Sequence, residues 1–153
     1  MPAKMLTELL EKSHVSYATV AHPPAYTAQE IAASAHVPGK EMVKTVMVKI
    51  NGRMAMLVLP STRKVVLYEL REMLGSDDVT FASENEFRDL FPDCEPGAMP
   101  PFGNLYGVDV YVAPSLAEDK EIAFNAGSHT ELMRVAYADF ARLVHPHVLA
   151  FTT

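Results

Sequence analysis

The stretch that decides the fold is MVKTVMVKINGRMAMLVLP, residues 42–60. Two runs rich in valine, methionine and leucine flank the pair Asn51-Gly52. An Asn-Gly pair between such runs is the strongest short-range signal for a β-hairpin, because both residues accept the positive φ angles of the tight turn. We therefore predict two antiparallel strands, the first before Asn51 and the second after Gly52.

Lys44 lies in the first of these strands. Because strand side chains alternate between faces, Lys44 shares a face with Val46 and Val48, whereas Thr45 faces the other way. A lysine beside valines either extends its stem along apolar surface at the open end of the strand or points into a cleft. In a cleft, its ammonium would bind a phosphate or carbonyl oxygen. The alternation alone leaves both interpretations open.

The sequence before the hairpin predicts two helices and a short strand. Apolar residues at helical spacing indicate the first helix, and Pro23 ends the strand. Thr27 and Glu30 have the spacing of a capping box, which begins the second helix. The predicted helices cover residues 5–10 and 27–37, and the strand covers 17–22.

After the hairpin, helices and strands are interspersed. Ser61 or Thr62 is predicted to cap a helix that Gly75 ends. Ser83 and Glu86 form a second predicted capping box. The predicted helices are 64–74, 84–91 and 138–145, and the predicted strands are 78–82, 107–113, 121–127 and 131–137.

Strands slightly outnumber helices, and the two do not alternate as in a strict βαβ fold. The hairpin and the short connections near the C-terminus require antiparallel pairing. We therefore predict an α+β (mixed α/β) fold: one curled, mainly antiparallel mixed sheet flanked by helices. At 153 residues the chain is predicted to be a single domain, 1–153, large enough to bury its own core.

Composition narrows the function classes. A single cysteine excludes an internal disulfide, and the absence of a leader pattern or a long apolar run predicts a cytoplasmic protein. The formal net charge of −6 argues against a protein that coats nucleic-acid backbone. Basic residues nevertheless concentrate in one quarter of the chain, and we predict that they form a local positive patch: Lys40, Lys44, Lys49, Arg53, Arg63 and Lys64.

The segment FPDCEPGAMPPFG, residues 91–103, allows three interpretations: a linker, a reactive thiol loop, or a rigid wall of a binding site. A linker is excluded because strands that pair with earlier ones are predicted on both sides. Asp93 and Glu95 should raise the pKa of the Cys94 thiol and suppress its thiolate. The remaining interpretation is a stiff loop from Gly97 to Gly103 whose backbone N–H groups can face a ligand.

A bend is predicted in FNAGSHTE, residues 124–131, at Gly127 and Ser128. His129 is then either a general base, a hydrogen-bond donor to a substrate, or an ordinary turn residue. No G-x-S-x-G elbow and no P-loop accompany it. His145 and His147 lack neighbouring cysteines or carboxylates in sequence, so no metal site is predicted.

Three segments in order, VKTVMV (43–48), GAMPPFG (97–103) and FNAGSHTELMR (124–134), resemble the YbaK/ProX-type domain family. That family is related to the editing insertion of bacterial prolyl-tRNA synthetases. The resemblance runs from about residue 17 to residue 143. It implies an aminoacyl-tRNA deacylase that hydrolyses the ester of a mischarged tRNA in trans and removes a small amino acid.

The resemblance also implies the site. Lys44, Gly97 and His129 are the implied catalytic residues, and a water positioned partly by the substrate's ribose attacks the ester carbonyl. No metal, cofactor or covalent nucleophile is implied. The implied substrate-binding residues are Tyr26, Thr27, Thr45, Met99, Pro101, Phe102, Gly103, Asn125, Gly127 and Ser128.

The implied partners are the acceptor end of a mischarged tRNA and an aminoacyl-tRNA synthetase, with no membrane and no DNA. The sequence has Lys44-Thr45 where several branches of the family have a Lys-Asn pair, which points away from the alanine- and cysteine-specific branches. The alternative hypothesis is a non-catalytic module of the same fold that binds a tRNA end, a nucleotide or a synthetase.

Overall fold

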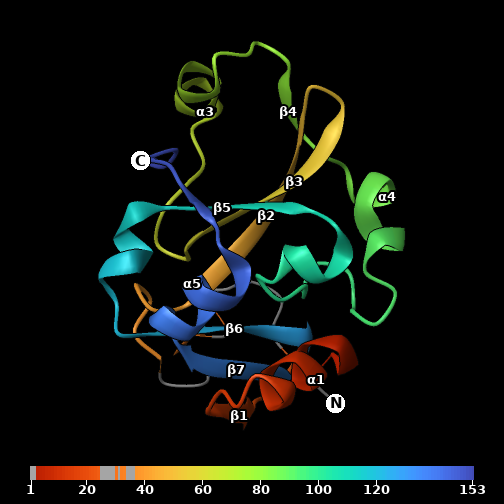
Figure 1. The fold of residues 1–153 in the computed structure, drawn as a ribbon, viewed down its shortest axis with the longest axis vertical. Helices are drawn as coiled ribbons and strands as arrows, with labels where there is room; N and C mark the ends of the chain where they lie inside the picture. The colour runs from red at the N-terminus through yellow and green to blue at the C-terminus, as the bar shows by residue number, and fades with distance from the viewer. Residues whose placement is uncertain (1–2, 25–29, 31, 34–36) are drawn as a thin grey trace.

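Two β-sheets, one above the other in Figure 1, form the frame of the computed structural model, which describes residues 3–24, 30, 32–33 and 37–153. The upper sheet has five strands in the order β4-β2-β3-β5-β8, and the lower sheet has three in the order β1-β7-β6. The strands are β1 Tyr17–Ala21, β2 Val43–Ile50, β3 Arg53–Pro60, β4 Val79–Phe81, β5 Asp109–Val112, β6 Glu121–Ser128, β7 Glu131–Ala136 and β8 His147–Val148.

Helix α1 lies beside the lower sheet, α5 crosses the front between the sheets, and α3 lies at the top of the view (Figure 1). The α-helices are α1 Lys4–Lys12, α3 Leu67–Leu74, α4 Glu84–Phe87 and α5 Tyr137–Val144. Short 3-10 helices are η1 Arg88–Leu90, η2 Gly103–Tyr106 and η3 Pro114–Glu118. The predicted α+β class is confirmed. Within the described part of the chain, no helix is long and apolar enough to cross a bilayer.

The predicted hairpin is confirmed and forms the centre of the larger sheet. Strands β2 and β3 pair antiparallel from Val43↔Pro60 to Ile50↔Arg53, and Asn51 and Gly52 take positive φ angles of 52° and 81° in the turn. The side chains alternate as predicted, since Met47 lies in one hydrophobic cluster and Val48 in another. Strand β4 pairs antiparallel with β2, whereas β5 pairs parallel with β3.

The predicted mixed, mainly antiparallel pairing is confirmed, but the strands divide between two sheets rather than one. Strands β1, β7 and β6 pair antiparallel with one another, and a single parallel bridge, Met42↔Ala123, connects them to the start of β2. The backbone N–H of Ala123 donates to the carbonyl of Glu41 at 2.9 Å there. The large hydrophobic cluster lies between the sheets and contains, for example, Met56 and Phe124. Two sheets bury this core from opposite sides, which a single layer of this size could not do.

The helix predicted over 64–74 begins later, at Leu67, and neither Ser61 nor Thr62 caps it. The reason is tertiary: Val65 bridges to Thr152, and the N–H of Val66 donates to the carbonyl of Phe151 at 2.8 Å. The C-terminal segment therefore holds the start of the predicted helix extended.

Two other predicted helix limits agree with the structure, and a third lies outside the described residues. The left-handed Gly75 ends α3 as predicted, with φ 64°. The capping box of Ser83 and Glu86 is also confirmed at the start of α4. The capping box at Thr27 lies outside the described residues.

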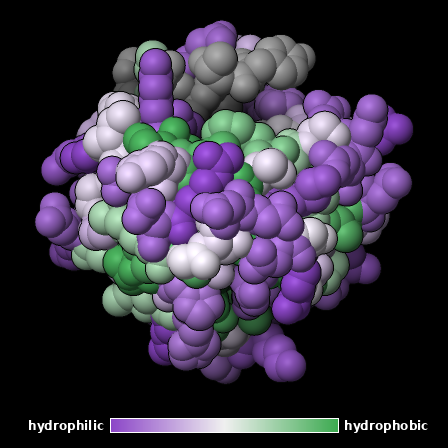
Figure 2. Space-filling model, turned by 90° about the horizontal axis from the view of Figure 1, so that it is seen from above, coloured by the Kyte–Doolittle hydropathy of each residue, from purple (hydrophilic) through white to green (hydrophobic). Residues whose placement is uncertain are grey.

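The end of the molecule that carries α3, β4 and the hairpin turn is seen from above in Figure 2. Hydrophilic side chains cover most of this face, with smaller hydrophobic areas between them. Tyr68, Met73 and Phe81 are among the exposed large hydrophobic residues of these elements.

Candidate functional site

The proline- and glycine-rich loop is joined by its backbone to the end of β6. The N–H of Glu95 donates to the carbonyl of Gly127 at 2.7 Å, and the N–H of Gly127 donates to the carbonyl of Ala98 at 3.0 Å. Gly97 adopts a left-handed conformation with φ 82°. The structure therefore brings together two predicted segments that lie about 30 residues apart in the sequence.

Gly127 is required by both conformation and space. Its φ is 101°, and a Cβ added there would lie 3.0 Å from the Cβ and 3.2 Å from the backbone nitrogen of Ala3. The N–H of Ala3 in turn donates to the carbonyl of Ala126 at 2.6 Å. The start of the chain therefore packs directly against the bulged end of β6.

His129 is buried and holds the loop. Its Nε2 lies 2.8 Å from the carbonyl oxygen of Pro96. Because a carbonyl can only accept, Nε2–H is the donor in this contact. The ring also lies next to Gly97, since a Cβ on that glycine would be 3.6 Å from Cε1. In this structure His129 positions the loop, and its predicted catalytic role stays a prediction.

Asn125 lies on β6 and pairs with Leu132. Leu132 belongs to the cluster that also contains Ala32, Val37 and Met42, so the Asn125 side chain faces that side of the smaller sheet. Its Oδ1 is buried and has no hydrogen-bond partner among the described residues. A buried amide oxygen without a partner is costly, so a donor from a ligand would find a ready acceptor here.

His22 was not predicted from the sequence. It is buried at the end of β1, and its N–H donates to the carbonyl of Thr130, in the turn that follows Ser128. Its Nδ1 lies 2.8 Å from the carbonyl of Pro23, while Nε2 is buried without a hydrogen-bond partner in the described part of the chain. The only sequence signal was a histidine directly before a proline pair.

The second half of the loop packs into the core. Phe102 has no exposed surface, and its ring lies 5.6 Å from that of Phe124 and 5.5 Å from that of Phe140, between centroids. Met99 is 5% exposed. Gly103 is packed so closely that an added Cβ would lie 3.0 Å from Val110 Cγ2. The Phe102 side chain therefore packs in the core and supports the loop, and its predicted contact with a substrate stays a prediction.

The remaining predicted binding residues divide between described and undescribed positions. Pro101 is buried, and Ser128 Oγ lies 3.3 Å from Thr130 Oγ1. Tyr26 and Thr27 lie outside the described residues.

Lys44 pairs with Leu59 across the hairpin and therefore shares its face of the sheet. Thr45 pairs with Val58 and faces the opposite side, where Met99 and Phe102 pack. Lys44 and the loop thus lie on different faces of β2. Strand β4 pairs with β2 only at residues 48–50, so no described strand pairs with the edge of β2 beside Lys44.

Burial lowers the pKa of the Lys44 ammonium, and the nearby positive charge of Lys64 lowers it further. Among the described residues, neither lysine has a carboxylate partner within ion-pair distance. Two neighbouring cations without a counter-charge form a site that favours an anion.

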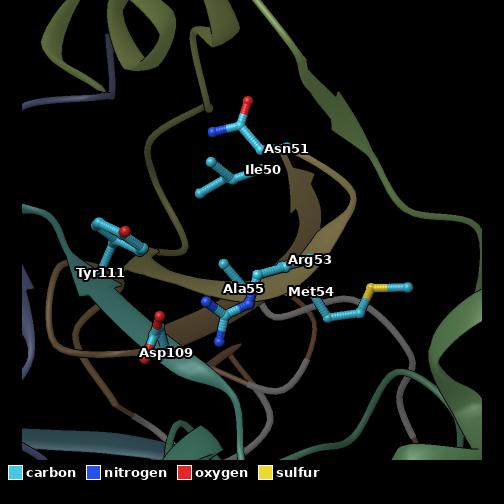
Figure 3. Close-up of a pocket in the computed structure, with 7 residues that line it drawn as sticks. All are labelled: Ile50, Asn51, Arg53, Met54, Ala55, Asp109 and Tyr111. Atoms are coloured by element: carbon cyan, nitrogen blue, oxygen red, sulfur yellow. The ribbon is translucent and has the colours of Figure 1, made fainter. Parts of the chain in front are cut away.

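The predicted six-residue basic patch is smaller than expected. Lys49 forms an ion pair with Glu86 at the other end of β2. Arg53 lines a pocket of about 180 Å³ next to the hairpin turn, where its side chain and that of Asp109 extend to the same side (Figure 3). The patch near the site consists of Lys40, Lys44, Arg63 and Lys64.

The surroundings of Cys94 disfavour its thiolate. Burial raises its pKa to about 12, and Asp93 adds to the increase. The predicted direction is confirmed, although burial is the larger cause. The Tyr106 hydroxyl donates a hydrogen bond to Asp93 Oδ1 at 2.8 Å and lies 3.6 Å from the sulfur of Cys94. Tyr106, Asp93 and Cys94 therefore form one small polar cluster.

We expect iodoacetamide to alkylate Cys94 at pH 8 at least ~100-fold more slowly than a free cysteine with a pKa of about 8.5, because only the thiolate reacts. Thiol labelling followed by mass spectrometry measures this rate. Denatured protein is the control, since unfolding should restore the ordinary rate. Equal rates in the native and denatured protein would contradict the raised pKa.

Comparison with known proteins identifies relatives of this chain. Residues 22–143 match the family model of the aminoacyl-tRNA editing domain. A proline–tRNA ligase of Macrococcus caseolyticus (strain JCSC5402) is 26% identical over 127 residues, which make up 82% of this chain. The chain spans about a fifth of that relative's length, 21%.

Solved structures share the fold. The crystal structure of hypothetical protein APE2540 has a TM-score of 0.87 at 21% identity and covers 98% of this chain and 100% of its own. A protein proposed to be a trans-editing enzyme for prolyl tRNA synthetase has a TM-score of 0.84 at 19% identity, with 99% of this chain and 96% of its own covered. At these identities the likeness concerns the fold alone.

Proposed function

Because this chain belongs to the aminoacyl-tRNA editing domain family, we propose that it hydrolyses the ester bond of a mischarged aminoacyl-tRNA in trans and releases a small amino acid. The acceptor end of the tRNA is the proposed partner, and a synthetase that produces the mischarged tRNA is the proposed second partner. Both proposals rest on the family and on the geometry described above.

One observation carries the proposal: the parallel bridge between Met42 and Ala123, which places the start of β2 beside β6. Two residues beyond the bridge, Lys44 lies on one strand and Asn125 on the other. The two strands therefore carry a cation and a buried amide oxygen at equivalent positions beyond the bridge. Those groups complement the phosphate and the amino group of an aminoacyl nucleotide.

The proposed chemistry uses positioning and electrostatics. Lys44 and Lys64 bind phosphate at the 3′ end, and the Asn125 Oδ1 accepts a hydrogen bond from the α-amino group. Backbone N–H groups at Gly97 face the carbonyl oxygen and stabilise the negative charge that develops on it. His129, through its hydrogen bond to Pro96, keeps the loop in this conformation.

The bond changes are those of ester hydrolysis. The oxygen of a water molecule attacks the ester carbonyl, the bond between that carbon and the ribose oxygen breaks, and the ribose oxygen takes up a proton from the attacking water. An aminoacyl ester is already reactive, so orientation and charge stabilisation can supply most of the acceleration. The proposed reaction therefore needs neither a metal ion nor a covalent intermediate.

A panel of tRNAs, each mischarged with alanine, serine, threonine or cysteine, tests this proposal. We expect the wild-type protein to release at least one of these amino acids faster than the spontaneous rate, with EDTA present, and to leave a correctly charged tRNA intact. Release of radiolabelled amino acid measures the reaction. Binding of these tRNAs without any hydrolysis would reject the enzymatic proposal and support the non-catalytic module.

A further inference from the structure

A second pocket opens beside the Lys44–Lys64 pair. It has a volume of about 380 Å³, and its lining includes Lys40, Thr62, Arg63, Ser115, Glu118 and Asp119. Its lining also includes Pro60, which pairs with Val43, the residue before Lys44. The pocket is thus adjacent to the proposed phosphate contact but is separate from the loop and from His129. Its volume lies in the range of pockets that hold small molecules, about 300–1,000 Å³.

Two residues that line this pocket each carry a buried polar atom without a hydrogen-bond partner in the described part of the chain. Ser115 Oγ and Asp119 Oδ2 have no hydrogen-bond partner among the described residues. Nearly all buried polar side-chain atoms in proteins have a partner, and an unpaired one is costly. A carboxylate oxygen can only accept, so Asp119 calls for a ligand that donates a hydrogen bond.

The pocket lining also contains two cations, Lys40 and Arg63. Lys40 and Arg63 are exposed on its rim, and one guanidinium nitrogen of Arg63 donates to the carbonyl of Thr153, which restrains the side chain. Glu118 is exposed as well and would repel an anion placed near it. A fitting ligand therefore combines a hydrogen-bond donor for Asp119 with an anionic group for Arg63.

The pocket wall is held in place before any ligand binds. Ser61 Oγ donates to the carbonyl of Gly39 at 2.8 Å, which ties the segment carrying Lys40 to the segment carrying Arg63. The close approach of these two segments requires a glycine at position 39, because an added Cβ would lie only 3.0 Å from Thr62 Cγ2. A preformed pocket loses less entropy on binding than one that must close around its ligand.

We propose that this pocket binds a cytidine nucleotide of the tRNA acceptor end, with the cytosine amino group donating to Asp119 and the phosphate contacting Arg63 and Lys40. The inference rests on the proposed function for its choice of partner. Cytidines precede the terminal adenosine in tRNA, and carboxylates accept hydrogen bonds from the cytosine amino group. Unpaired RNA ends are commonly read through such base edges.

Titration with cytidine and uridine monophosphates, followed by NMR chemical shifts, tests the proposal. Uracil has an acceptor where cytosine has its amino group, so the wild-type protein should bind the cytidine compound about 10-fold more tightly. Asp119→Ala should abolish this preference, whereas Arg63→Gln should weaken the binding of both nucleotides by the same factor. Asp109→Ala and Arg53→Gln, in the pocket of Figure 3, are matched controls and should leave binding unchanged.

Equal affinity for both nucleotides, an unchanged preference in Asp119→Ala, or displacement of the cytidine compound by free alanine would overturn the proposal. Circular dichroism checks the fold of each variant, and Arg63→Gln, on the exposed rim, provides a second test if Asp119→Ala does not fold. Because free nucleotides contain no aminoacyl ester, binding of these compounds and failure to deacylate tRNA are separate results. Cytidine binding without deacylation would reject only the proposed function.

Discussion

Phe102→Ala is expected to lower the free energy of unfolding by about 3–5 kcal/mol, because a fully buried ring packed between two others would be replaced by a cavity. Urea denaturation followed by circular dichroism measures the change. The loss would be a large fraction of the stability of a typical domain, which is about 5–15 kcal/mol. The loop that carries Gly97 would lose its support at the same time.

Two further variants separate packing from ligand contact. Tyr68→Ala, at a site 65% exposed on α3, should change the free energy of unfolding by less than about 0.5 kcal/mol. Phe102→Leu keeps much of the apolar volume and should retain deacylation. A Phe102→Ala protein that is as stable as wild type but slower in deacylation would support the contact with substrate that the sequence suggested.

Lys44→Met is expected to reduce kcat/KM for deacylation by about 10–100-fold, since a hydrogen bond to a charged group contributes about 1.5–3 kcal/mol. Methionine keeps the apolar stem and removes only the charge. Because the Lys44 pKa is lowered in the folded protein, its charge at neutral pH costs stability. The variant should therefore unfold at the same or a higher denaturant concentration, so that lost activity cannot be assigned to unfolding.

The pH dependence of kcat/KM tests the role of the Lys44 ammonium independently. The ammonium is present below its pKa and is lost as the pH rises through it. The lowered pKa places this loss below the usual value of about 10.4. After subtraction of spontaneous hydrolysis, kcat/KM should fall in that range for wild type but not for Lys44→Arg, because arginine stays charged.

Lys49→Met is the matched control for Lys44→Met. Lys49 lies on the same strand, pairs with Glu86 and is placed away from the proposed site, so its removal should leave deacylation unchanged. Equal losses in both variants would indicate a general effect of charge on tRNA binding and would contradict the assigned role of Lys44.

Local signals in the sequence predicted local structure well. The Asn51-Gly52 turn, the αL end of α3 at Gly75 and the capping box at Ser83 each depend on a few consecutive residues, and all are present. The alternation of β2 was predicted for the same reason. The start of α3 was not, because the segment that holds Val66 extended lies more than 80 residues away, near the C-terminus.

The sequence by itself determined the hairpin, the α+β class and the segments that make up the candidate site, since these follow from turn chemistry, periodicity and motif order. Only the tertiary structure decided how those segments meet. It divided the strands between two sheets, buried Phe102, and turned Lys44 and Thr45 toward opposite faces. The physical reason is that contacts between distant segments depend on how the whole core is buried, and no local stretch of sequence records that.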